Sequence, residues 1–87
     1  MIVDIKSSFQ KDAKKLPPQI QNQLYIIIEN LERSSTLSEI SNCKKLIGTK
    51  NAYRIRSGNY RIGFLFANNK IELIRVLNRK EIYRYFP

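Results

Sequence analysis

The chain has 87 residues, with 16 lysines and arginines against 7 aspartates and glutamates, and a formal net charge of +9. With 43% hydrophobic residues it is too apolar for a disordered basic tail, and it has neither an apolar run of about 18 residues nor a signal-peptide pattern, so we expect one domain over 1–87. The absence of histidine excludes serine–histidine and cysteine–histidine nucleophile pairs, and the lone Cys43 allows neither a structural zinc site nor an internal disulfide.

The N-terminal half predicts one strand followed by two helices. Residues 2–6 alternate around β-branched side chains and predict a strand. Ser7 and Gln10 have capping-box spacing, which predicts a helix over about 8–15. The pair Pro17 and Pro18 should end that helix and begin the next. The second helix has an apolar stripe with helical spacing: Ile20, Leu24, Ile27, Ile28 and Leu31.

The C-terminal half predicts strands. After a loop at 34–36 and an irregular helical turn over 37–42, the hydrophobic period changes to two. Strands are predicted at 45–48, 52–57, 60–67 and 70–77, with turn signals at 58–59 and 68–69. These connections are too short for crossover helices, so the last three strands should form an antiparallel meander. The predicted class is α+β, with the helices on one face of an antiparallel sheet.

Three arginines are predicted to share the sheet face opposite the helices. Alternation sends Tyr53 and Ile55 to one side of their strand and Arg54 and Arg56 to the other, and Arg61 of the next strand should join them. Like charges across a hairpin cost stability, which favours a site for a polyanion. The alternative is a solvated face of scattered arginines. Net charge alone admits a nucleic acid, a membrane surface or an acidic protein as the partner.

Basic and aromatic side chains are interleaved near the C-terminus. Arg75, Arg79, Lys80 and Arg84 alternate with Tyr83, Tyr85 and Phe86. Aromatic rings among guanidinium groups suit stacking on unpaired bases and binding of their phosphates. The alternative is that some of the rings pack on the sheet, which we expect of Phe86 and not of Tyr83.

Three segments carry a family pattern: KKLIG at 44–48, AYRIRSGNYRI at 52–62 and NRKEIY at 78–83. Together they closely resemble the RelE/ParE superfamily of toxins from type II toxin–antitoxin systems, over nearly the whole chain. The resemblance implies a RelE-like fold, with two N-terminal helices packed on one face of a small curved antiparallel sheet. It also implies a cognate antitoxin, which the net charge of +9 predicts to be acidic. The single cysteine and the lack of a long apolar run lead us to expect a cytoplasmic protein without cofactor, metal or membrane.

The RelE-like branch of this superfamily cleaves messenger RNA in the ribosomal A site, so the resemblance implies a metal-independent endoribonuclease. Matching motif positions and the basic and aromatic pattern give the candidate catalytic residues Arg56, Arg61, Arg79 and Tyr83 and the candidate RNA-binding residues Arg54, Lys80, Arg84 and Tyr85. The ParE-like branch keeps the fold and inhibits DNA gyrase, generally without this set, and is the alternative. A catalytically decayed relative that still binds antitoxin is a third possibility.

Two departures from the family pattern concern the general base. Asn78 stands where many relatives have histidine, and Arg54 and Arg56 contrast with the hairpin lysines of RelE-like enzymes. Arginine stays protonated at any accessible pH and cannot act as a conventional base. Lys80 and Glu81 are weaker candidates, so the base is unassigned.

Overall fold

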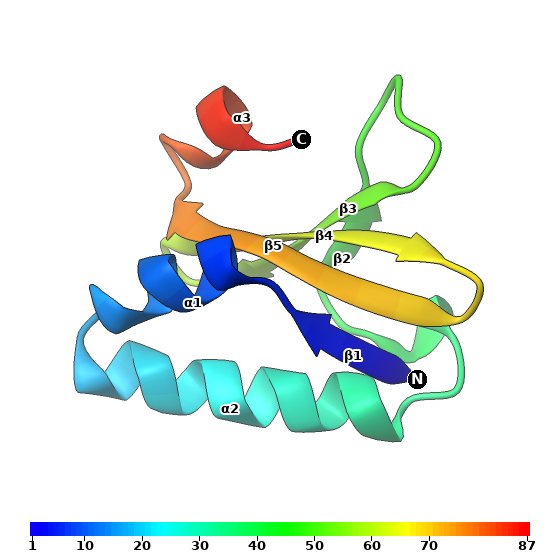
Figure 1. Cartoon of the computed structure of the whole chain (residues 1–87), viewed down its shortest axis with the longest axis horizontal. Coiled ribbons are helices and arrows are strands. Elements are labelled where there is room, and N and C mark those ends of the chain that lie inside the picture. Colours follow the sequence, from blue (N-terminus) through cyan, green and yellow to red (C-terminus); the bar gives the residue numbers. More distant parts are fainter.

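A curved five-stranded sheet lies between two helical layers of unequal size (Figure 1). The computed structural model describes residues 1–87. Its elements are, in order, β1 (Ile2–Ile5), α1 (Ser7–Lys14), α2 (Pro18–Arg33), the short 3₁₀ helix η1 (Leu37–Glu39), β2 (Cys43–Lys45), β3 (Ala52–Ser57), β4 (Tyr60–Ala67), β5 (Lys70–Asn78) and α3 (Ile82–Tyr85). None of the helices has the length and apolar character needed to cross a membrane.

The strand order is β1-β5-β4-β3-β2. Strands β3 to β5 form the predicted antiparallel meander, and β2 also pairs antiparallel with β3. The sheet is mixed, however, because β1 pairs in parallel with β5 at the edge. Alternation identifies β1 as a strand, but it carries no information about a partner so distant in sequence. The α+β class with two N-terminal helices on one face is confirmed, with this parallel edge strand as the difference.

The predicted strand at 45–48 is wrong in position, because β2 covers Cys43–Lys45. The chain leaves the ladder after Leu46, whose N–H donates to the carbonyl of Ala52 at 2.8 Å. Gly48 then adopts φ +82°, and the Thr49 hydroxyl donates to the carbonyl of Leu46 at 2.8 Å. Residues 46–51 therefore form a raised loop between β2 and β3.

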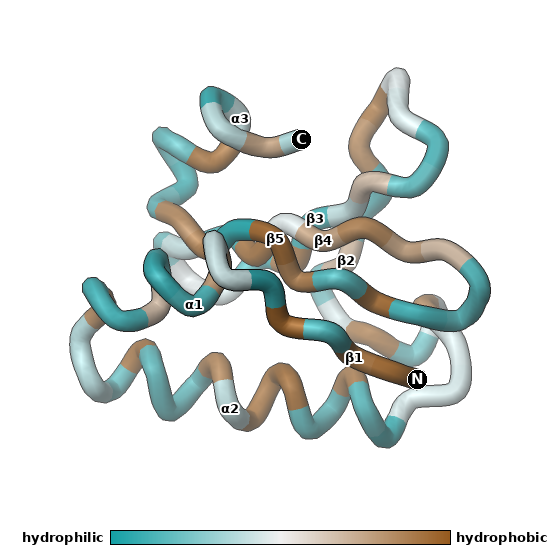
Figure 2. Tube along the Cα trace, viewed as in Figure 1, coloured by the Kyte–Doolittle hydropathy of each residue, from teal (hydrophilic) through white to brown (hydrophobic).

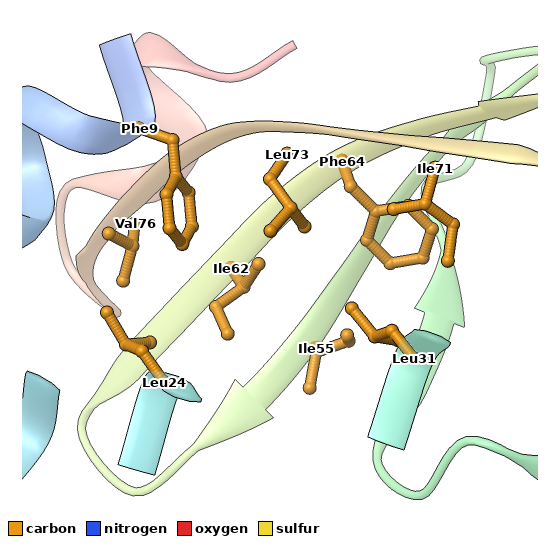
Figure 3. Close-up of a cluster of buried hydrophobic side chains, with 9 residues drawn as sticks. All are labelled: Phe9, Leu24, Leu31, Ile55, Ile62, Phe64, Ile71, Leu73 and Val76. Atoms are coloured by element: carbon orange, nitrogen blue, oxygen red, sulfur yellow. The ribbon is translucent and has the colours of Figure 1, made fainter. Parts of the chain in front are cut away.

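The main core lies between the sheet and the pair α1 and α2 (Figure 3). It contains Phe9, Leu24, Leu31, Ile55, Ile62, Phe64, Ile71, Leu73 and Val76. The stripe predicted for α2 is confirmed, since Leu24 and Leu31 are fully buried and Ile27 and Ile28 pack against the cluster. Figure 2 shows the apolar residues of α2 recurring on the side toward the sheet. Burial of this stripe holds the helix, as expected for an amphipathic element.

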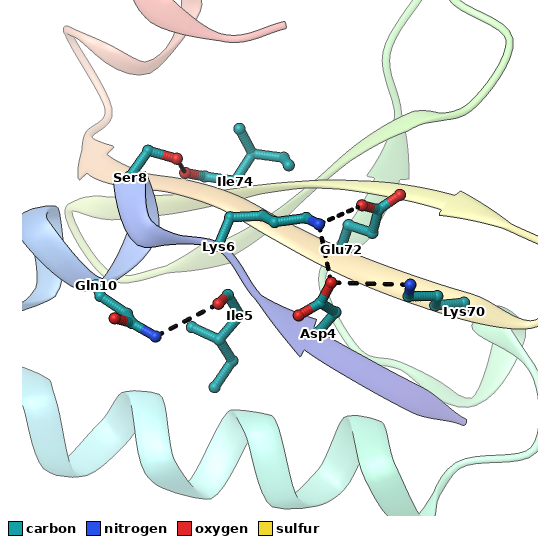
Figure 4. Close-up of polar contacts among 8 residues, drawn as sticks. All are labelled: Asp4, Ile5, Lys6, Ser8, Gln10, Lys70, Glu72 and Ile74. Carbon is teal, nitrogen blue, oxygen red and sulfur yellow. Dashed lines mark hydrogen bonds and ion pairs between the residues drawn. The ribbon is translucent and has the colours of Figure 1, made fainter.

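The capping box predicted at Ser7 and Gln10 is wrong. Lys6 is the N-cap residue of α1, and no side chain caps the helix. The backbone N–H of Lys6 instead donates to the carbonyl of Leu73 at 3.0 Å, which connects the start of α1 to β5. Ser8 therefore reaches β5, where its hydroxyl donates to the carbonyl of Ile74 at 2.6 Å (Figure 4).

Alternating charges neutralise one another across β1 and β5. The register places Asp4 beside Glu72, and Lys6 bridges them at 2.9 and 3.0 Å (Figure 4). The hydrogen bond to Asp4 is the main reason that the pKa of Lys6 is raised, and the same contact lowers the pKa of Asp4. Charged side chains on an edge strand discourage pairing with another chain. This cluster is balanced in sign and offers no net site for an anion.

A buried carboxylate links α1 to β5. Asp12 is 8% exposed and accepts hydrogen bonds from Arg75 Nε at 2.7 Å, Arg75 Nη2 at 3.1 Å and the backbone N–H of Val76 at 3.1 Å. The bond to Asp12 raises the pKa of Arg75. Asp12 and Arg75 satisfy each other's charge and hydrogen-bonding groups, so α1 has a fixed position on the sheet.

Asp12→Ala should lower the free energy of unfolding by about 2–4 kcal/mol, because Arg75 and the Val76 N–H lose a buried partner. Urea unfolding followed by circular dichroism measures this change. Glu29→Ala, which breaks the exposed Glu29–Arg33 pair of α2 (3.6 Å), is the matched control and should change stability by less than about 0.5 kcal/mol. Equal effects of the two substitutions would contradict the structural role of Asp12.

Candidate nucleic-acid interface

The register of the β3–β4 hairpin places its arginines together. Arg56 lies directly opposite Arg61, and Arg54 lies opposite Gly63. By alternation these residues leave the strands on the face opposite Ile55 and Ile62, which point into the main core, as predicted. Near the 58–59 turn, Arg56 and Arg61 also border a hollow whose far side is α2. Together with Arg79, they form what we call the arginine cluster.

No carboxylate pairs with any residue of the arginine cluster, since the arginines in ion pairs are Arg33 and Arg75. The cluster instead donates to neutral oxygens of nearby loops. Arg54 Nη1 donates to the carbonyl of Asn42 and Arg56 Nη2 to its side-chain oxygen, both at 3.3 Å. Arg61 Nη1 donates to the carbonyls of Gly58 and Tyr60 at 2.8 and 2.9 Å. The positive charge is therefore held in place without being neutralised.

The surroundings of Arg61 show how close the site residues are. Its pKa is lowered first by desolvation and then by the neighbouring guanidinium groups of Arg54, Arg56 and Arg79, while Tyr83 acts in the opposite direction. Four side chains, from β3, the residues after β5 and α3, therefore lie near enough to Arg61 on β4 to influence its charge. A bound anion would relieve this repulsion.

The turn after β5 brings Arg79 to the hairpin. The N–H of Arg79 donates to the carbonyl of Asn59 at 2.8 Å. Asn78 then shapes the turn, since its side-chain oxygen accepts from the N–H of Lys80 and its carbonyl from the N–H of Glu81, both at 2.9 Å. Asn78 therefore has a structural role in this chain.

The short helix α3 was not predicted, and it covers part of the arginine-bearing face. Ile82 and Phe86 are buried with Ala52 in a second cluster, while Leu65 and Ile74 of the sheet pack beside them. The spacing of four residues between Ile82 and Phe86 is typical of one helical turn. A single turn is too short for the sequence alone to distinguish it from a loop. The expectation that Phe86 packs on the sheet is confirmed.

The two C-terminal tyrosines point in different directions. Tyr83 and Tyr85 are 58% and 50% exposed, and helix geometry places them about 200° apart around α3. Tyr83 lines the same hollow as Arg54 and is near enough to Arg61 to influence its pKa, whereas the ring of Tyr85 lies 5.5 Å from the guanidinium carbon of Arg75. The structure therefore brings Arg54, Arg56, Arg61, Arg79 and Tyr83 together and separates Tyr85 from them. Lys80 and Arg84 are exposed and line neither of the hollows beside the cluster.

Two hollows flank the arginine cluster. One, the stacking groove, lies between the raised loop and α3 with a volume of about 370 Å³, and is lined by Lys44, Lys45, Leu46, Ile47, Thr49, Arg54, Tyr83, Phe86 and Pro87. Lys44 and Lys45 were not among the predicted site residues. Their place in a short edge strand just before the Gly48 turn was the only available signal.

The other hollow, the polar cleft, has a volume of about 1160 Å³. It lies between α2, the segment 33–42 and the β3–β4 turn, and Arg56, Arg61 and Arg79 line its hairpin side. The cleft contains few apolar groups, so it suits a polar ligand more than an apolar one.

The chemical groups at the site favour binding and charge neutralisation. Four guanidinium groups and a tyrosine ring match phosphate and base chemistry. Cys43 is half-buried, and burial raises the pKa of its thiol, with Arg54 opposing, which favours an unreactive side chain. No group of three or more histidine, cysteine, aspartate or glutamate residues lies together to hold a metal ion.

A family model described as "ParE toxin of type II toxin-antitoxin system, parDE" matches residues 3–83. The chain belongs to this family of toxins. It is 43% identical to Toxin RelE3 of Methanocaldococcus jannaschii over 88 residues, covering 100% of both chains. The toxin is thus RelE-like, in agreement with the resemblance seen in its motifs.

Solved structures share the fold of this toxin. A RelB-RelE antitoxin–toxin complex from Methanococcus jannaschii matches with a TM-score of 0.83 and 42% identity, covering 97% of this chain and 99% of the other. An archaeal RelE-RelB complex from Pyrococcus horikoshii matches with a TM-score of 0.72 and 24% identity, covering 90% and 93%. The second likeness concerns the fold alone.

Gly63→Ala should loosen α3 and displace Tyr83. A Cβ atom at Gly63 would lie 2.5 to 2.8 Å from three ring carbons of Phe86, so the ring must leave its position. We expect a loss of about 1–3 kcal/mol of stability and faster hydrogen exchange of the Phe86 amide, which donates to the carbonyl of Ile82 at 2.8 Å.

Amide exchange measured by NMR tests this prediction. Adding Phe86→Leu to Gly63→Ala provides the control, because the smaller side chain makes room for the methyl group and should restore part of the protection. Unchanged exchange in Gly63→Ala would show that Phe86 does not hold α3 on the sheet.

Proposed function

We propose that this toxin is a ribosome-dependent messenger RNA endoribonuclease that inhibits translation. The observation that carries the proposal is the arginine cluster without carboxylate partners, set beside the exposed ring of Tyr83. A cluster of this kind is costly unless an anion occupies it. Tyr83 and the stacking groove add a surface for an unpaired base, which favours single-stranded RNA over duplex DNA.

The proposed reaction is attack of the ribose 2′-oxygen on the adjacent phosphorus, with departure of the 5′-oxygen. The products are a 2′,3′-cyclic phosphate and a 5′-hydroxyl. Arg56 and Arg61, which face each other across the hairpin, are suited to the phosphorane oxygens, and Arg79 to the leaving oxygen. Tyr83 would stack on a base or transfer a proton.

The proposal assigns no general base, because the cluster consists of guanidinium groups that stay protonated. Catalysis would therefore depend on alignment of the 2′-oxygen with the phosphorus and on charge stabilisation. A ribosome that holds the message in the right conformation would supply this alignment. Weak cleavage of free RNA follows from the same argument.

Arg61→Ala should lower the single-turnover rate of cleavage on programmed ribosomes by about 100-fold or more, by analogy with loss of one transition-state donor. Tyr83→Phe separates two roles of the ring. Near-normal cleavage by Tyr83→Phe with loss in Tyr83→Ala indicates stacking, whereas loss in both variants indicates proton transfer.

Circular dichroism and thermal melts show whether each variant is folded, and Lys11→Ala on the exposed side of α1 is a matched charge-removing control. Full cleavage by folded Arg61→Ala and Tyr83→Ala proteins would overturn the site assignment. A gyrase supercoiling assay run beside it tests the alternative suggested by the family model. Inhibition of supercoiling with no cleavage would favour gyrase as the target.

The proposed protein partner is a cognate antitoxin, as in the RelB-RelE complex from Methanococcus jannaschii to which the chain is 42% identical, and we propose that it is acidic. A net charge of +9 would attract an acidic segment, and apolar side chains are available to hold it. Tyr25 and Ile26 of α2 are 64% and 60% exposed, and Tyr25 lines an apolar groove of about 260 Å³ between α1 and α2.

Raising the salt concentration should slow association with the antitoxin more than it speeds dissociation, because charge steers the encounter and apolar burial holds the complex. Surface plasmon resonance with the purified cognate antitoxin measures both rates. A complex that dissociates in moderate salt would contradict this division of roles.

A further inference from the structure

One wall of the polar cleft is unlike the arginine cluster. It presents the amide side chains of Gln23 and Asn30 from α2 and the carboxylate of Glu39 at the end of η1. Its one cation, Arg33 at the end of α2, is paired with Glu29 at 3.6 Å. A carboxylate repels phosphate, so this wall is unsuited to the RNA backbone. Amide and carboxylate groups instead match the hydrogen-bonding edges of bases.

The carboxylate of Glu39 is fixed and ionised. Its Oε2 accepts from the backbone N–H groups of Ser35 at 2.6 Å and Thr36 at 2.8 Å. The bond to the Thr36 N–H is one half of a capping box on η1, in which the Thr36 side chain in turn accepts from the backbone N–H of Glu39. These bonds, with that to Thr36 first, lower the pKa of Glu39. Because Oε2 is occupied, Oε1 is the acceptor left for a ligand, and a rigid acceptor without a proton can only pair with a donor.

We propose that the polar cleft holds one base of the bound RNA and that Glu39 selects bases with an exocyclic amino group over uracil. The proposal rests on the proposed RNA-cleaving function and names a specificity site for it. Cytosine, adenine and guanine each offer an exocyclic amino group to the carboxylate. Uracil has a carbonyl oxygen where cytosine has its amino group, and its one donor, the ring N3–H, is flanked by two carbonyl oxygens that a carboxylate repels.

The position of the cleft agrees with this assignment. Arg56, Arg61 and Arg79 belong to both the arginine cluster and the cleft, so a phosphate on these arginines has its nucleotide within reach of the amide and carboxylate wall. The stacking groove lies on the Tyr83 side of the cluster. An RNA strand that crosses the arginine cluster therefore places one base in the stacking groove, beside Tyr83. It places another base in the polar cleft, where side chains can form hydrogen bonds with its edge. The volume of about 1160 Å³ exceeds the roughly 300–1,000 Å³ of typical small-ligand sites and is sufficient for a nucleotide.

Short oligocytidylate and oligouridylate of equal length provide the test, because both are single-stranded pyrimidine polymers of the same charge. Fluorescence anisotropy with labelled oligomers measures binding without requiring cleavage. We expect the wild-type toxin to bind oligocytidylate about tenfold more tightly, as for one hydrogen bond to a charged acceptor.

Glu39→Gln is the decisive variant. Glutamine also supports a capping box, and its oxygen should take the place of Oε2 on the Ser35 and Thr36 N–H groups. Its NH₂ group then occupies the place of Oε1 and donates into the cleft, which disfavours cytosine and favours uracil. The preference for oligocytidylate should fall below twofold or reverse. Removal of the negative charge alone would strengthen binding of both oligomers equally and leave the ratio unchanged.

Asn30→Ala and Asn22→Ala form a matched pair on α2, since both side chains are exposed but only Asn30 lines the cleft. Asn30→Ala should reduce the base preference and Asn22→Ala should preserve it. Equal binding of the two oligomers by the wild-type protein, or an unchanged ratio in folded Glu39→Gln, would overturn the proposal.

Cleavage on ribosomes programmed with messages that differ in C or U at the cut codon separates this proposal from the proposed function. If the wild-type toxin cleaves but shows no base preference in either assay, the specificity site is wrong and the cleavage proposal stands. Preferential binding of oligocytidylate, lost in Glu39→Gln, with no cleavage on ribosomes would support the site and reject the reaction.

Discussion

The pairing of Ile55 with Ile62 across β3 and β4 is the constraint on which the rest of the structure depends. Both side chains are buried against α1 and α2, and a slip by one residue would turn them to the other face. The same register sets Arg56 opposite Arg61 on the reverse side of the hairpin. Apolar burial therefore provides the stability that holds like charges close together. A single strand register fixes both the core and the candidate site.

The C-terminal residues depend on a second set of contacts. Phe86 packs against the bare backbone of Gly63, and Ile82 is buried beside it, so α3 stays on the sheet through apolar contact. Arg75 adds a polar connection, because it pairs with buried Asp12 of α1 and lies under the ring of Tyr85. Residues from opposite ends of the chain thus hold the single helical turn that presents Tyr83.

The cations of the structure fall into those with carboxylate partners and those without. Lys6 and Arg75 both have carboxylate partners, and each contributes to a strand or helix contact. The arginine cluster has none, and it lies between the stacking groove and the polar cleft, whose α2 side carries amides, the Glu39 carboxylate and Arg33. A ligand with regularly spaced phosphates and bases of both stacking and hydrogen-bonding character would satisfy all three surfaces, which is the chemistry of single-stranded RNA.

The sequence by itself determined the strands β3 and β4, the helix α2 and the arginines of the hairpin, because alternation and helical spacing are local signals that burial reinforces. Its motifs also indicated the toxin family. Tertiary structure decided the parallel pairing of β1, the start of α1 at a bond to Leu73, and the place of β2, since each depends on a partner far along the chain. It also decided that Tyr83 joins the arginine cluster while Tyr85 does not. Both tyrosines fit the same basic and aromatic pattern, and only the packing of α3 against Gly63 fixes which one faces the hairpin.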